Sequence, residues 1–115
     1  GRDDEAVAAV AFEAAQLFYH QDRFDDAAEW MLEAMRIWIL VHGDFHHNVL
    51  ASLVTLGNVY KQQGKLDKAL KTQKQAVRIA RRLYGDDSDN VATALSHVGL
   101  CLFQLGEYDG AMEKY

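Results

Sequence analysis

Apolar residues recur along most of this chain at the three- and four-residue spacing of amphipathic helices. Between Asn48 and Gln63 they fall on one helix face, at Val49, Leu50, Leu53, Leu56, Val59 and Tyr60. Gly64 follows, where a residue in the left-handed conformation commonly ends a helix. A second amphipathic pattern runs from about Leu66 to Tyr84, and no proline interrupts either segment. The pattern predicts a helical hairpin over residues 48–84.

This hairpin pattern recurs at a constant offset of 42 positions, the spacing from Val7 to Val49 and from Gly43 to Gly85. A fixed period of this size is typical of stacked repeat proteins, in which each unit buries its apolar face against its neighbours. We therefore expect one repeat domain over residues 1–115. Its repeats are predicted at about 4–45, 46–87 and 88–115, the last of them truncated.

The offset predicts six helices in three antiparallel hairpins. The pairs are expected at about 4–21 with 24–42, 48–63 with 66–84, and 90–105 with 108–115. The third turn is expected at Gly106, the counterpart of Gly64. Because the chain stops about half-way along the sixth helix, we expect it to be a fragment of a longer protein.

The second hairpin, LVTLGNVYKQQGKLDKALKTQKQA, resembles the tetratricopeptide repeat. The positions that carry the resemblance are Leu53, Leu56, Gly57, Tyr60, Gly64, Leu66, Ala69 and Ala76, then Leu95, Gly99, Leu102, Gly106, Tyr108, Ala111 and Tyr115. The first repeat departs from the pattern, since Ala15 and Asp22 replace its two glycines. The 42-residue length and the A-x-R-I tails at Ala34 and Ala76 are similar to the kinesin light chain subtype.

The resemblance covers essentially the whole chain and implies an all-α fold, a right-handed α-solenoid of antiparallel helix hairpins. It also implies a non-catalytic scaffold or adaptor that binds a peptide or partner protein on its concave face, which the first helix of each pair would line. The expected partner-binding residues are Phe12, Gln16, Tyr19, Asn58, Lys61, Gln62, His97, Leu100, Phe103 and Gln104, with Val54 and Thr55 on the same face. Alternatively, Leu100 and Phe103 pack against a neighbouring repeat. The cationic clamp that family members use for chaperone tails is absent.

A second surface is predicted on the helix at residues 27–41, which is apolar nearly all round. Bulky residues stand there where the next repeat has polar ones, as Leu32 against Lys74 and Ile39 against Arg81. A surplus apolar face implies burial by another surface. The residues assigned to this face are Trp30, Leu32, Trp38, Ile39 and Leu40. The alternatives are homodimerisation, docking of a partner helix, or cover by preceding sequence.

Composition narrows the chemistry further. The net charge of −5 argues against nucleic acid, and the basic cluster Arg78, Arg81 and Arg82 is interpreted as a solvated helix face. The longest apolar stretch is too short for a membrane span. The absence of a signal-peptide pattern and the single cysteine, Cys101, favour the cytoplasm, where the kinesin light chain resemblance is compatible with the cytoskeleton.

Catalytic and metal-binding patterns are not found. His42, His46 and His47 lie across a glycine-containing turn rather than on one helix face, so a loop is favoured over a zinc site. Residues 86–89 resemble the start of a calcium loop but lack its glycine and its terminal glutamate. We therefore expect no enzyme activity, no cofactor and no bound metal.

Overall fold

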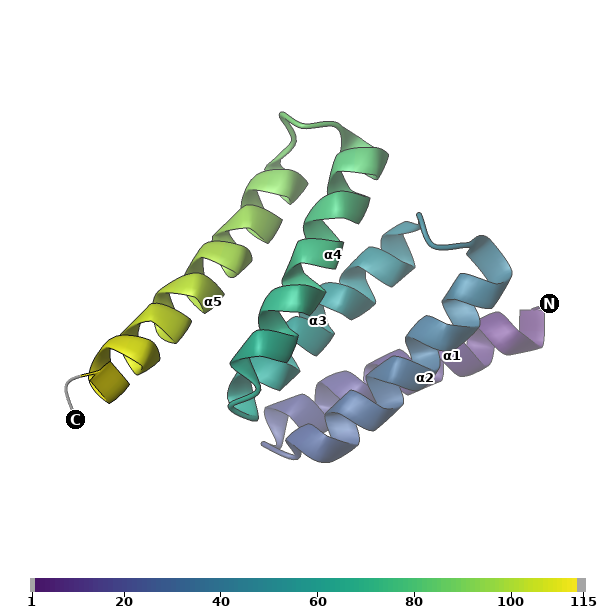
Figure 1. Ribbon diagram of the computed structural model, residues 1–115. Coiled ribbons are helices and arrows are strands. Elements are labelled where there is room, and N and C mark those ends of the chain that lie inside the picture. Colours follow the sequence, from purple (N-terminus) through teal and green to yellow (C-terminus); the bar gives the residue numbers. More distant parts are fainter. Residues whose placement is uncertain (1, 114–115) are drawn as a thin grey trace.

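The computed structural model describes the backbone of residues 2–113 and the side chains of residues 4–107, and these residues form five helices and no strand. The helices follow one another as a chain of antiparallel hairpins in an elongated body of 54 × 35 × 19 Å (Figure 1). They are α1 (Arg2–His20), α2 (Phe24–His42), α3 (His47–Gln62), α4 (Leu66–Tyr84) and α5 (Asp89–Glu113). The first five predicted helices are thus present; the ends of α1 to α4 lie within a few residues of those expected, whereas α5 continues well past its predicted end at about residue 105.

The turns within the first two hairpins share one geometry. Asp22 and Gly64 have positive φ angles of 62° and 78°. In each turn the next amide donates back across the helix end, Arg23 N to Phe18 O and Lys65 N to Tyr60 O, both at 2.9 Å. This is the hydrogen bonding of a left-handed helix cap, which satisfies carbonyls that the helix leaves free. Asp22 therefore does the work of the glycine that the first repeat lacks.

The left-handed conformation of Asp22 carries a steric cost that glycine avoids. We expect Asp22→Gly to raise the free energy of unfolding by about 0.5–1 kcal/mol, because an L-side chain disfavours this conformation by about that much or more. Urea denaturation followed by circular dichroism measures the change. The matched substitution at Asp44, an exposed loop residue without a positive φ, should give no gain.

The predicted sixth helix is wrong for the residues described. Instead of turning at Gly106, α5 runs on through it to Glu113 (Figure 1). Gly106 has no positive φ, whereas Gly64 does. Starting a new helix after Gly106 would require a new first turn, and helix nucleation is unfavourable. Continuing α5 satisfies the backbone without a new nucleus. Lys114 and Tyr115, which belong to the predicted sixth helix, lie outside the described residues.

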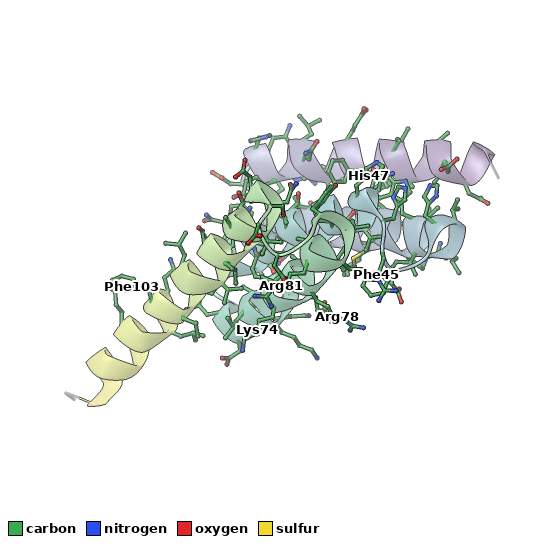
Figure 2. All side chains as sticks on the ribbon, turned by 90° about the horizontal axis from the view of Figure 1, so that it is seen from above. Phe45, His47, Lys74, Arg78, Arg81 and Phe103 are labelled. Carbon is green, nitrogen blue, oxygen red and sulfur yellow. The ribbon has the colours of Figure 1, made fainter. Side chains whose placement is uncertain are left out.

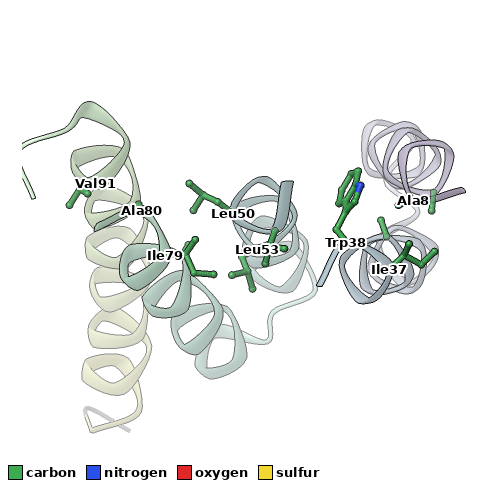
Figure 3. Packing of buried hydrophobic residues seen from close by; sticks show 12 residues of the cluster. Ala8, Ile37, Trp38, Leu50, Leu53, Ile79, Ala80 and Val91 are labelled. Carbon is green, nitrogen blue, oxygen red and sulfur yellow. The ribbon is translucent and has the colours of Figure 1, made fainter. Parts of the chain in front are cut away.

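Burial follows the hairpin order, since α1 packs on α2, α3 on both α2 and α4, and α4 on α5. One apolar cluster joins Ala8 and Trp38 of the first hairpin to Leu53 and Ile79 of the second and reaches Val91 of α5 (Figure 3). A second cluster surrounds Met31 and Val59 and includes Cys101. The core is therefore continuous along the array, as expected for stacked repeats.

One outer face of α1 lacks the cover that its counterparts receive. On α3, Val49, Ser52 and Val59 are nearly inaccessible, as are the corresponding α5 residues Val91, Ala94 and Cys101. On α1 the residues 42 positions earlier, Val7, Val10 and Leu17, are 54%, 63% and 57% exposed. This exposed stripe was not predicted, although the 42-residue offset between α1 and α3 contains the information needed to find it.

Candidate functional site

A groove of about 390 Å³ crosses the first helices of all three repeats. We call it the α1–α3–α5 groove. Its lining residues are Phe12 and Gln16 of α1, His47, Leu50, Ala51, Val54 and Thr55 of α3, Tyr84 of α4, and Asn90, Thr93 and Ala94 of α5. The groove lies where the sequence predicts a binding face, because the first helix of each hairpin contributes to it.

The floor of the groove is apolar and firmly packed. Phe12 is half-buried against both core clusters, and its ring lies 5.4 Å from that of Trp38. Leu50 is buried and Val54 half-buried beside it. Since these side chains are held by the core, the floor is preformed, which reduces the ordering cost of binding.

The walls of the groove carry hydroxyl and amide groups but no Lys, Arg, Asp or Glu. Gln16 and Thr93 are exposed, and Thr55 Oγ1 donates to the Ala51 carbonyl at 3.0 Å, which leaves its lone pairs able to accept. An apolar floor with a few polar groups around it is the usual composition of a ligand groove. The arrangement fits an uncharged stretch of polypeptide, whose amides would pair with Gln16, Thr55 and Thr93.

The remaining predicted residues of α3 and α5 lie further along these helices. Asn58 and Lys61 are half-buried, whereas Gln62 is exposed. Burial lowers the pKa of His97 on α5, and the positive charge of the nearby Lys61 lowers it further. The enclosed atoms His97 Nδ1 and Gln104 Oε1 have no hydrogen-bond partner within the described part of the chain. Enclosed polar atoms of this kind are costly unless a ligand or water pairs with them.

The large apolar residues predicted for the binding face but lying outside the groove divide into two groups. Tyr19 is half-buried and packs edge-on against Phe24 at 5.6 Å, so it belongs largely to the first hairpin. Leu100 and Phe103 are 52% and 64% exposed, and Phe103 projects from α5 far from the groove (Figure 2). Lys61, which precedes Phe103 by 42 positions, lies near α5. In α3, the position equivalent to Phe103 thus faces the first helix of the next repeat. This agrees with the alternative prediction that Phe103 packs against a neighbouring repeat.

The apolar face predicted on α2 does not form as one surface. Trp38 is only 6% exposed and belongs to the core, and Ile39 is half-buried against it, so neither is free to bind. Trp30, Leu32 and Leu40 are exposed. Trp30 and Leu32, however, point about 160° apart around the helix.

Charged side chains also interrupt this surface. The ion pair of Glu33 and Arg36, 2.6 Å between Oε1 and Nη2, lies between the two flanks of α2. Hydrogen bonding to Arg36 is the main reason that the pKa of Glu33 is lowered. Homodimerisation stays a prediction, and α2 offers less apolar surface for it than the sequence indicated.

Three histidines gather at the junction of the first two repeats. The rings of His42 and His46 stack at 3.9 Å with 7° between their planes, and His47 lies 4.2 Å from His46. His42 is hydrogen-bonded to Glu5 of α1. The amide of Asn48 donates to His46 Nδ1 at 3.1 Å, so His46 is the N-cap of α3. No group of three or more His, Cys, Asp or Glu residues within the described chain is arranged to hold a metal ion.

The N-cap hydrogen bond requires His46 to be neutral at Nδ1. Burial, then the charges of His42 and His47, lower the pKa of His46 below 6.5, while Glu5 opposes the shift. Asp44 is the other carboxylate of this loop. His46 binds a proton more readily in the unfolded chain than in the folded one. The stabilisation by its N-cap hydrogen bond is therefore complete above pH 6.5 and is lost as the pH falls below that value.

We expect the free energy of unfolding to fall measurably between pH 7 and pH 5, by about 1 kcal/mol from the N-cap of α3. His46→Asn keeps a capping oxygen but cannot titrate, so its loss over this range should be smaller. Urea denaturation at both pH values measures the difference. His97, whose pKa is lowered mainly by burial, contributes equally to both proteins. Equal pH dependence of the two proteins would contradict this role for His46.

Two other features bear on chemistry. Cys101 is buried, and burial raises the pKa of its thiol, which makes it a poor nucleophile. None of the helices in the described part of the chain has the length and apolar character that spanning a membrane requires.

Stacked helical hairpins with a groove across their first helices define a helical repeat protein. The tetratricopeptide repeat model matches residues 4–82 and again residues 53–115. The chain therefore belongs to the tetratricopeptide repeat family, as the sequence motifs indicated. Members of this family are generally non-catalytic and mediate protein–protein interaction.

Among solved structures, the crystal structure of BtubC (BKLC) from P. vanneervenii is similar to this chain. The two share 20% sequence identity over 97% of this chain, with a TM-score of 0.68. This chain spans 51% of the length of that protein. At this identity the likeness concerns the fold alone. No curated protein matches the chain.

Proposed function

We propose that this chain is a non-catalytic interaction module that binds a segment of a partner protein in the α1–α3–α5 groove. The observation that carries the proposal is the groove itself, because its lining comes from the first helices of all three repeats. A ligand lying in it would contact every repeat at once. Lys61, His97 and Gln104 extend this surface towards the C-terminal ends of α3 and α5.

The lining predicts the kind of ligand. The groove has no Lys, Arg, Asp or Glu, so binding would depend mainly on an apolar anchor above Phe12 and Val54 and on hydrogen bonds to Gln16, Thr55 and Thr93. Such a ligand is an uncharged peptide with one or two aliphatic or aromatic residues. The affinity of this contact should change little with salt.

Selection from a random peptide library displayed on phage tests the proposal. We expect uncharged, apolar-anchored peptides that bind with micromolar affinity. Thr93→Trp should fill the groove and weaken binding of a selected peptide by about tenfold or more. Ser96→Trp is the matched control, since Ser96 is exposed on the same helix but does not line the groove. Equal binding by both variants would contradict the proposed site.

Two finer features complete the proposal. The 42-residue repeat and its A-x-R-I tails support a kinesin light chain-like subtype, and the likeness of fold to BtubC is in keeping with it. We further propose a right-handed solenoid, on the strength of the family resemblance.

A further inference from the structure

The three histidines at the junction of the first two repeats reach the α1–α3–α5 groove. His47, the first residue of α3, lines the groove together with Leu50 and Ala51 of the same helix end. The ring centre of His46 lies 4.2 Å from that of His47, and His46 is the N-cap that begins α3. The histidine cluster, which we define as His42, His46 and His47, therefore supports one edge of the proposed binding site.

The geometry of the histidine cluster requires His46 to be neutral. The Asn48 amide donates to His46 Nδ1 at 3.1 Å, and a protonated Nδ1 cannot accept this hydrogen bond. The rings of His42 and His46 are stacked with their centres 3.9 Å apart. Two imidazolium ions at that separation repel each other. A proton on His46 therefore removes the cap of α3, and protons on both rings also disfavour the stack.

The charged groups around His46 do not compensate a proton on its ring. Burial and the other two histidines lower the pKa of His46, and Glu5 of α1 opposes them only weakly, since Glu5 is hydrogen-bonded to another ring of the cluster. The loop carboxylate of Asp44 is exposed. From α4, two guanidinium groups lie over the ring of the residue before His46; they belong to Arg78 and Arg82. Among the described side chains, no carboxylate is at hydrogen-bond or ion-pair distance from His46.

The second junction of the array shows that capping does not require histidine. Ser88 stands 42 positions after His46 and caps α5, since its Oγ accepts from the amide of Val91 at 3.2 Å. The other two residues of the histidine cluster have no histidine counterpart there either. Serine is among the preferred N-cap residues and its hydroxyl does not titrate near neutral pH. Helix capping alone therefore does not account for three histidines at the first junction.

We propose that the histidine cluster makes peptide binding in the α1–α3–α5 groove dependent on pH, strong near pH 7.5 and weaker near pH 5.5. This inference rests on the proposed function and adds a regulation of the same site. A proton on His46 removes the cap from the first turn of α3, from which His47 and Leu50 line the groove. A proton on His47 also places a positive charge in a lining that has no Lys or Arg.

The probe is a peptide selected against the chain at pH 7.5. It has blocked ends and no titratable side chain, so its own charge does not change with pH. Fluorescence anisotropy should show binding about tenfold weaker at pH 5.5 than at pH 7.5, which lies in the usual range of coupling between two sites. Circular dichroism at both pH values checks that the chain stays folded.

Matched variants assign the pH dependence to the cluster. His46→Ser copies the cap of the second junction, so it should bind the peptide as the original chain does at pH 7.5 and lose most of the change at pH 5.5. His20→Asn removes an exposed histidine of α1 that lies outside the cluster and does not line the groove. This control should keep the tenfold change.

Proton release provides a test that needs no substitution. If protons weaken peptide binding, peptide binding must release protons in the pH range in which His46 titrates. Isothermal titration calorimetry in two buffers that differ in ionisation enthalpy measures this release. We expect a net release of protons at pH 6.0 and none at pH 8.0. The result holds even if a variant fails to fold.

Several results would overturn the proposal. Equal affinity at both pH values, or no proton release at pH 6.0, would contradict the regulation and leave the groove as the binding site. An unchanged pH dependence in His46→Ser would also contradict it. Loss of the pH dependence in His97→Asn alone would assign the titration to α5 instead. If no peptide is selected at all, the proposed function fails and this inference fails with it, so the two failures are distinguishable.

Discussion

Gly57→Ala should destabilise the protein by up to about 2 kcal/mol, although alanine is the better helix former. A Cβ at Gly57 would lie 2.2 Å from Nε2 and 2.6 Å from Cδ of Gln73, which is buried in α4 and cannot move out freely. Overpacking of this kind costs about 1–3 kcal/mol, and the gain in helix propensity of about 1 kcal/mol offsets only part of it. Urea denaturation measures the net effect.

The third repeat provides the matched control. Gly99 stands 42 positions after Gly57, and a Cβ there meets nothing within 4 Å. Gly99→Ala should therefore stabilise the protein by about 0.5–1 kcal/mol. Gln73→Ala should rescue Gly57→Ala in a double-mutant cycle. The first repeat already shows this solution, since Ala15 occupies the glycine position with Met31 at the place of Gln73. Destabilisation by Gly99→Ala would contradict this interpretation.

Trp38→Ala should lower the free energy of unfolding by about 3–5 kcal/mol, because it empties a space in the core beside Phe12. Trp30→Ala, on the same helix, should cost less than about 1 kcal/mol because Trp30 is 42% exposed. Chemical denaturation distinguishes the two. If Trp38 were instead an interface residue, its loss would change the solution mass seen by light scattering and leave the monomer about as stable as before.

The helices could be predicted from the sequence because their signals are local. Apolar spacing defines α1 to α5, and Gly43, Gly64 and Gly85 mark their ends with positive φ angles. The sixth helix could not be predicted in the same way. The sequence pattern at Gly106 resembles that at Gly64, yet the chain turns at Gly64, where φ is positive, and continues as a helix at Gly106.

The errors on α2 have a packing origin. Trp38 was assigned to the apolar face together with its bulky neighbours, because this helix is apolar nearly all round; its counterpart in the next repeat is Ala80. Both residues are buried, however, because the first hairpin accommodates the larger ring against Phe12. Comparing the residue types at equivalent positions of two repeats does not show how much space surrounds each side chain.

The α1–α3–α5 groove could be predicted in part. Phe12, Gln16, Val54 and Thr55 were expected on the binding face from the family resemblance together with helical periodicity, and all four line the groove. The contributions of His47 and Tyr84 were missed, because they come from helix ends that meet only after the repeats stack. Periodicity identifies the face of a helix, whereas the part of the helix that lines a groove depends on the angles between helices.

The most direct test of the central claim is to map a selected peptide onto the chain by NMR, using amide chemical shifts. We predict that the largest changes fall at Gln16, Ala51, Thr55 and Thr93, which come from three different helices. Amides of α2 around Trp30 should not move. A map centred on α2, or confined to the exposed end of α5 around Phe103, would contradict the assignment of the α1–α3–α5 groove as the partner-binding site.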